Sequence, residues 1–95
     1  MIINHLLLKL QNRTTASIAQ TKGILLSMEG RIEVLRKIRV ETDIRQGASS
    51  YDLMLITGFA SMADFDTYLL HPVHQEVSAY VGNVVAAAAS VCYES

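Results

Sequence analysis

The stretch from Tyr68 to Val77, YLLHPVHQEV, concentrates side chains that can carry out acid–base chemistry. It holds two of the three histidines and the only proline of the chain. A histidine near neutral pH can take a proton from a carbon flanked by carbonyls, and a phenol can donate a hydrogen bond to the enolate oxygen. His74 is expected at the third position of a helix, where the dipole and the free N–H groups disfavour a cation. A neutral imidazole at position 74 is the form that a general base needs.

The same side chains also have structural interpretations. Tyr68 follows Phe65 by three positions on a short amphipathic segment, which suits a partly buried structural tyrosine equally well. His71 precedes a proline that begins a helix, where an imidazole can accept a hydrogen bond from an exposed N–H group of the next turn. His5 lies among leucines in NHLLLKL, which is typical of a satisfied core histidine, with pocket lining as the alternative. A role in catalysis and a role in packing or capping therefore both remain open for these side chains.

Metal binding is another use of two histidines three positions apart. Pro72 separates His71 from His74, and the first of them is expected outside the helix, so the two rings need not converge. Without a fixed third ligand we predict no metal site. Cys92 is the only cysteine, which excludes an intramolecular disulfide and a cysteine-based zinc site, and we expect a buried, inert thiol in the last strand.

The apolar patterns predict the elements that position these residues. We expect strands at residues 2–10, 33–44, 51–60 and 87–94, and helices from Thr14 or Thr15 to Gly30, from Ser61 to about His71, and from Pro72 onward. A helix remains an alternative for the first half of 33–44, and alanines also favour a helix near residue 87. The helical residues expected to face the core are Ile18, Thr21, Leu25, Met28, Met62, Phe65, Leu69, Val73, Val77, Tyr80, Val81 and Val84.

This order of elements is that of a ferredoxin-like βαββαβ sandwich, an α+β fold in a single domain at residues 1–95. Such a fold leaves one sheet face bare, and here the strands at 2–10 and 51–60 are apolar on both faces. Covering several hundred Å2 of apolar surface is favoured by roughly 25 cal/mol per Å2, and a second copy is the simplest cover. We therefore expect a homodimer through the β-sheet face, with two sheets closing into a barrel.

Charge and hydropathy exclude several kinds of partner. The net charge is −1, so no field exists that would attract nucleic acid or an anionic membrane. The apolar start is interrupted by Asn4, His5 and Lys9 and does not match a signal peptide, and no run reaches the length of a membrane span. We expect a cytoplasmic protein.

Three segments resemble the stress-responsive A/B barrel (Dabb) family of dimeric α+β barrel proteins. They are NHLLLKL with His5, YDLMLITGF, and above all FASMADFDTYLLHPVHQEV, whose most specific part is a tyrosine followed after two residues by HPxH. The resemblance covers nearly the whole chain. It implies a ferredoxin-like protomer and a dimer with a central β-barrel.

The resemblance also implies an activity. Many members of the family are of unknown function, but one plant member is a polyketide cyclase that performs an aldol condensation on a linear tetraketide without a metal or organic cofactor. Its catalytic tyrosine and second histidine of the motif match Tyr68 and His74, and the histidines that match His5 and His71 lie in the same pocket, which implies substrate-binding roles. The segment TTASIAQTKGILLSMEG lacks the aromatic residues that line the cyclase's cavity, so a different substrate is expected.

The resulting hypothesis is a homodimer that binds a small, largely apolar ligand between sheet and helices and acts on a keto compound as a cofactor-free lyase or cyclase. The alternative is a non-catalytic stress-response or interaction module whose dimer is the functional unit. A Tyr68 hydroxyl paired with a His74 nitrogen at a cavity would favour the first hypothesis. A filled cavity, with His71 and His74 bonded to backbone, would favour the second.

Overall fold

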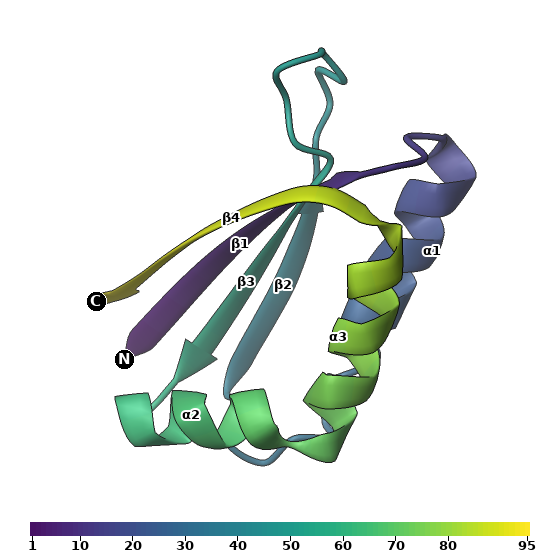
Figure 1. The fold of residues 1–95 in the computed structure, drawn as a ribbon. Helices are drawn as coiled ribbons and strands as arrows, with labels where there is room; N and C mark the ends of the chain where they lie inside the picture. Colours follow the sequence, from purple (N-terminus) through teal and green to yellow (C-terminus); the bar gives the residue numbers. More distant parts are fainter.

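In the computed structural model of residues 1–95, a four-stranded antiparallel sheet carries three helices on one face (Figure 1). The strand order is β2-β3-β1-β4. This arrangement confirms the predicted ferredoxin-like βαββαβ fold, with two consecutive helices in the place of the second one. The elements are β1 (Ile2–Leu10), α1 (Thr15–Leu26), β2 (Lys37–Thr42), β3 (Leu53–Phe59), α2 (Met62–Leu70), α3 (Pro72–Val84) and β4 (Val85–Glu94).

Side-chain caps begin the first two helices where the sequence predicts them. The hydroxyl of Thr14 accepts a hydrogen bond from the Ser17 N–H at 3.1 Å, so Thr14 and not its neighbour caps α1. The hydroxyl of Ser61 accepts from the Asp64 N–H at 3.2 Å at the start of α2. Each contact satisfies one of the N–H groups that a helix leaves unpaired in its first turn.

Three boundaries differ from the sequence prediction. The helix α1 ends at Leu26, and turns lead on to Gly30, whose φ of 78° suits a residue without a side chain. The strand β2 begins at Lys37, because the residues before it form turns that bury Ile32 in the core. The strand β4 begins at Val85, directly after α3, because its antiparallel ladder with β1 outweighs the helical propensity of its alanines.

The core lies between the sheet and the helices. Most residues predicted to face it from the helices do so, but Met62 and Leu69 of α2 are exposed. Tyr68 takes the inward position instead, because its ring packs against Phe59 at a centroid distance of 4.9 Å. The buried apolar cluster consists of Ile2, Leu8, Leu10, Ile18, Leu25, Met28, Ile32, Val40, Leu53, Leu55, Phe59, Tyr68 and Val77.

A buried carboxylate ties β1 to the long loop before β3. Asp52 is 1% exposed. One of its oxygens accepts from the Leu10 N–H at 2.8 Å and the other from Nε of Arg13 at 2.9 Å. Arg13 also donates to the carbonyls of Gly47 and Ser50 at 3.1 and 3.0 Å. The ion pair therefore fixes the 43–52 loop, which projects beyond the sheet in Figure 1, to the connection between β1 and α1.

The face of the sheet opposite the helices is uncovered, and it is largely apolar on β1, β3 and β4. Side chains of the central strands β1 and β3 and of β4 form a shallow depression on this face. Val91 and Tyr93 in this depression are 64% and 45% exposed. On the same face, a Cβ added at Gly58 would lie 3.0 Å from the Lys37 Cβ, so this glycine neither enlarges a cavity nor brings a helix closer. None of the helices has the length and apolar character that a membrane crossing needs. The uncovered face, as meant below, is the part of this surface on β1, β3 and β4 formed by Ile3, His5, Leu7, Met54, Ile56, Ala89, Val91 and Tyr93. At its β2 edge the same surface carries the charged residues Lys37, Arg39 and Glu41.

Candidate functional site

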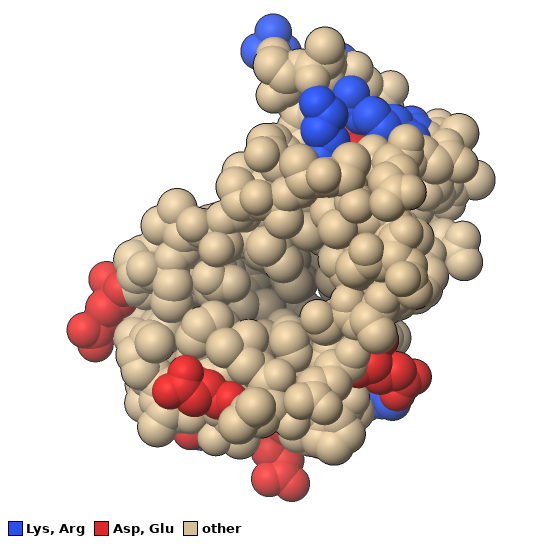
Figure 2. All heavy atoms as spheres, viewed as in Figure 1, with Lys and Arg blue, Asp and Glu red and all other residues tan.

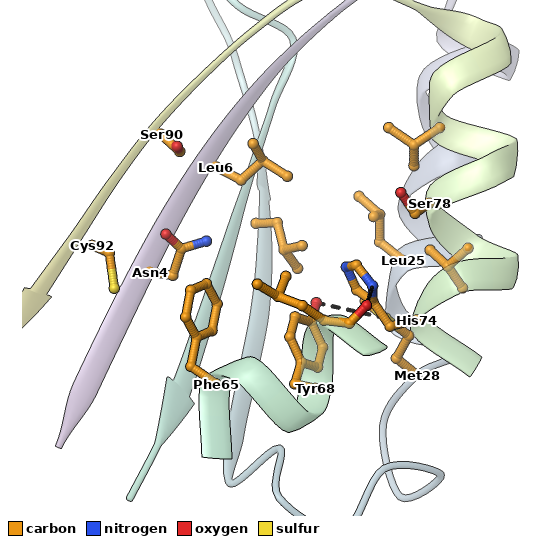
Figure 3. A pocket seen from close by; sticks show the side chains of 14 residues that line it. Asn4, Leu6, Leu25, Met28, Phe65, Tyr68, His74, Ser78, Ser90 and Cys92 are labelled. Carbon is orange, nitrogen blue, oxygen red and sulfur yellow. Dashed lines mark hydrogen bonds between the residues drawn. The ribbon is translucent and has the colours of Figure 1, made fainter. Parts of the chain in front are cut away.

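A cavity of about 350 Å3 lies between the sheet and the helices (Figure 3). Figure 2 shows it as a hollow bordered by uncharged side chains. Ten of its 14 lining residues are hydrophobic, and its volume falls within the range of about 300 to 1,000 Å3 that is usual for small-molecule sites. The polar lining residues are Asn4, His74, Ser78 and Ser90.

Tyr68 reaches the cavity from α2 and is buried. Its hydroxyl lies 3.8 Å from Sδ of Met28, a weak acceptor. Burial raises the pKa of the Tyr68 phenol to about 12, because the phenolate is disfavoured away from water. At neutral pH the hydroxyl therefore keeps its proton and can donate it to a better acceptor inside the cavity.

His74 reaches the cavity from the first turn of α3. Its ring lies 4.4 Å from the Tyr68 ring, centroid to centroid, at an interplanar angle of 54°. The hydrogen bond between the Tyr68 hydroxyl and a His74 nitrogen that would favour the catalytic hypothesis is absent. Instead, His74 Nδ1 lies 3.1 Å from the Leu69 carbonyl oxygen.

This backbone contact determines which nitrogen of His74 can act as a base. A carbonyl oxygen only accepts, so Nδ1 carries the proton and Nε2 holds the free lone pair of the neutral ring. Burial lowers the pKa of His74, and the positive charge that His71 can carry lowers it further, while the Leu69 hydrogen bond opposes both. Figure 3 shows one ring nitrogen directed into the hollow. The geometry is that of an uncharged base facing an apolar cavity.

His71 lies outside the cavity and caps α3. Its Nδ1 accepts a hydrogen bond from the Val73 N–H at 3.1 Å. This is the structural interpretation that the sequence offered for a side chain before Pro72. The structure therefore does not bring His71 to the lining that contains Tyr68 and His74.

His5 lies on the uncovered face of the sheet, so the expectation that it shares the cavity with Tyr68 and His74 is wrong. Its Nε2 is 3.0 Å from the Tyr93 hydroxyl, and the two rings stack at a centroid distance of 5.5 Å. Successive residues of a strand point to opposite faces, and the even-numbered residues of β1 face the helices. Asn4 therefore occupies the cavity wall where His5 was expected.

Two further lining residues come from β4. Ser90 and Cys92 pair across the sheet with Leu6 and Asn4 of β1, which also line the cavity. The prediction of a buried thiol is wrong, because Cys92 is exposed and no helix covers this part of β4. Asn4 could have been found from the sequence, since it is the one polar residue among the even positions from Ile2 to Leu10.

The fold and the cavity define a ferredoxin-like α+β domain with a potential binding site between sheet and helices. Residues 3–95 match the model of the Stress Responsive A/B Barrel Domain, or Dabb, so the chain belongs to this family. No curated protein matches the sequence.

Several solved structures share the fold at low sequence identity. A dimeric protein of unknown function from Bacteroides fragilis superposes with a TM-score of 0.82 at 23% identity, over 99% of this chain and 96% of its own. A dimeric ferredoxin-like protein of unknown function from Thermobifida fusca gives 0.85 at 20% identity, over 99% and 90%. A hydroxynitrile lyase from Passiflora edulis gives 0.82 at 15% identity, over 97% and 91%. At these sequence identities, the similarity to the three structures establishes the fold alone.

Proposed function

We propose that the chain binds a small, largely apolar keto compound in this cavity and that His74 removes a proton from the carbon beside a carbonyl. The observation that carries the proposal is the unfilled apolar cavity that His74 and Tyr68 line. The contact of His74 Nδ1 with the Leu69 carbonyl occupies only one ring nitrogen and leaves Nε2 as a base next to the Tyr68 ring. The reaction class is a cofactor-free lyase or cyclase step.

The chemistry follows from the two side chains. Nε2 of His74 accepts the carbon-bound proton, and the electron pair of the C–H bond passes into the enolate. Its oxygen accepts a hydrogen bond from Tyr68, because an anionic oxygen is a far better acceptor than the Met28 thioether. In a cyclisation the enolate carbon attacks a second carbonyl, and the imidazolium returns its proton to the new alkoxide. The Passiflora edulis lyase supports the view that this fold accommodates lyase chemistry.

The alternative of a non-catalytic module draws on the backbone contacts of both histidines. His71 and His74 each place Nδ1 on a backbone group. The contact of His74 occupies only one ring nitrogen, however, and the cavity beside it is not filled by side chains. These two features favour the ligand-binding function.

Deuterium exchange tests the catalytic function without knowledge of the natural substrate. Wild-type protein should accelerate exchange at the carbon between the carbonyls of a linear 1,3-diketone, followed by proton NMR. His74→Gln should reduce this acceleration at least about tenfold, and Tyr68→Phe should reduce it as well, because the enolate loses its donor. Tyr80→Phe and Glu76→Gln on α3 are the matched controls and should behave as wild type. Equal exchange by wild type and His74→Gln would remove His74 from the chemistry.

We also propose that the chain forms a symmetric homodimer through the uncovered face of the sheet. The exposure of Val91 and Tyr93 there, and the description of the Bacteroides fragilis and Thermobifida fusca proteins as dimeric, support this assembly. Light scattering should give twice the protomer mass of 10.5 kDa. Val91→Asp should shift the equilibrium towards monomer, because a carboxylate would be buried at the interface. A wild-type mass of one protomer at micromolar concentration would contradict the proposal.

A further inference from the structure

The cavity carries no formal charge at neutral pH. None of its lining residues is a lysine, arginine, aspartate or glutamate, and in Figure 2 the charged groups lie away from the hollow. Tyr68 stays protonated there, since burial raises its pKa to about 12. His74 stays neutral, since burial lowers its pKa. A buried carboxylate or phosphate would find no cation to compensate for its lost hydration.

The wall opposite His74 contains an asparagine, Asn4, whose amide bonds to no other lining residue. Asn4 projects from β1 towards the helices, and Figure 3 draws no hydrogen bond from its amide to another lining residue. Its cross-strand partner Thr57 is 0% exposed, and the Thr57 hydroxyl has no hydrogen-bond partner. Thr57 does not line the cavity and Asn4 is half-buried, so the Asn4 amide is the group with unused hydrogen-bonding capacity at this end of the cavity. Asparagine is also disfavoured in strands, which argues against a packing role.

We propose that Asn4 is a specificity-determining residue of the cavity, whose amide N–H donates to one carbonyl of an uncharged 1,3-dicarbonyl ligand while the other carbonyl lies at Tyr68 and His74. The cavity then selects neutral ketones and esters over the corresponding carboxylates. This inference rests on the proposed function, because it places the acidic carbon of the ligand at His74. It adds the substrate class and the group that recognises it.

A matched pair of ligands tests the selection. Nonane-2,4-dione and 3-oxooctanoate share the same alkyl chain and keto group, and they differ in a methyl ketone against a carboxylate. Calorimetry at neutral pH should show that the wild type binds the dione at least about tenfold more tightly, because the carboxylate must lose its hydration without a cation. Asn4→Leu should weaken binding of the dione about tenfold. Asn83→Leu on the exposed side of α3 is the matched control and should bind as wild type.

A thiol on the neighbouring strand gives a readout in the unmodified protein. Cys92 pairs with Asn4 across the sheet, is exposed and lines the cavity. Saturating nonane-2,4-dione should therefore slow alkylation of Cys92 by iodoacetamide at least about fivefold. This measurement stays decisive even if Asn4→Leu fails to fold, and Asn4→Val, which suits a strand, provides a second variant.

The outcomes separate this inference from the proposed function. Equal affinity for dione and acid, unchanged affinity in Asn4→Leu, binding without protection of Cys92, or no binding of the dione would each overturn the role of Asn4. Loss of His74-dependent exchange with intact, Asn4-dependent binding would overturn the catalytic function alone. Exchange that depends on His74 but not on Asn4 would leave the catalytic function standing without this specificity.

Discussion

Replacing Asp52 with alanine should destabilise the protein by about 3 kcal/mol, although the residue lies outside the cavity. The substitution leaves the buried Leu10 N–H without its acceptor, which costs about 1 to 3 kcal/mol. It also leaves Arg13 without its carboxylate. Breaking a fully buried ion pair costs roughly 3 to 5 kcal/mol. Because Arg13 is 28% exposed and keeps two carbonyl partners, the loss of its carboxylate should cost less than that. A domain of this size has a total stability of about 5 to 14 kcal/mol.

Urea denaturation provides the measurement. With a slope of about 1.5 kcal/mol/M, the expected loss moves the unfolding midpoint down by about 2 M. All variants are compared at one protein concentration, since the proposed dimer would couple stability to concentration. Asp52→Asn keeps one acceptor oxygen and should lose less than Asp52→Ala.

The control is the surface ion pair between Arg39 and Glu41, whose side chains are 58% and 51% exposed. Glu41→Ala should change the free energy of unfolding by less than about 1 kcal/mol, because water screens and solvates both partners. A double-mutant cycle with Arg13→Ala isolates the interaction across the buried pair. A loss in Asp52→Ala no larger than that in Glu41→Ala, or a cycle without coupling between positions 13 and 52, would show that the buried pair does not stabilise the fold.

Two further predictions concern the histidines of the HPVH segment. His71→Ala should cost about 1 kcal/mol in urea denaturation, because the Val73 N–H loses its cap, whereas His71→Asn should retain most of the stability; equal losses in both variants would show that the capping contact is not what His71 contributes. Burial lowers the pKa of His74 below its ordinary value of 6.5, so below pH 6.5 the unfolded state binds more protons than the folded state. Stability from this group is therefore present above pH 6.5 and is lost as the pH falls through the lower folded pKa. The difference in unfolding free energy between wild type and His74→Gln, measured from pH 7 to pH 5, should change in that direction, and a flat difference would contradict it.

The fold was predictable because its signals are local. The caps at Thr14 and Ser61, the proline at the start of α3 and the apolar alternation of the strands each act within a few residues. The strand β4 was harder to delimit, since only its pairing with β1 decides between strand and helix for an alanine-rich segment.

The site was predictable only in part, because the sequence does not say which face of a two-sided apolar strand the helices cover. Both parities of β1 carry leucine and isoleucine, so His5 and Asn4 were equally compatible with the cavity wall. The resemblance to the family favoured His5, and the register of the sheet places Asn4 there instead. Tyr68 and His74 came together because they lie on consecutive helices joined at one residue, which sequence spacing constrains directly.

The position of β4 at the edge of the sheet has a consequence for how the protomer moves. This strand supplies Ser90 and Cys92 to the cavity wall, pairs only with β1, and is exposed over nearly its whole length. Segments with few buried contacts open locally at a free energy well below that of global unfolding. In the isolated protomer, the amides of β4 should therefore exchange with solvent sooner than those of β1 and β3.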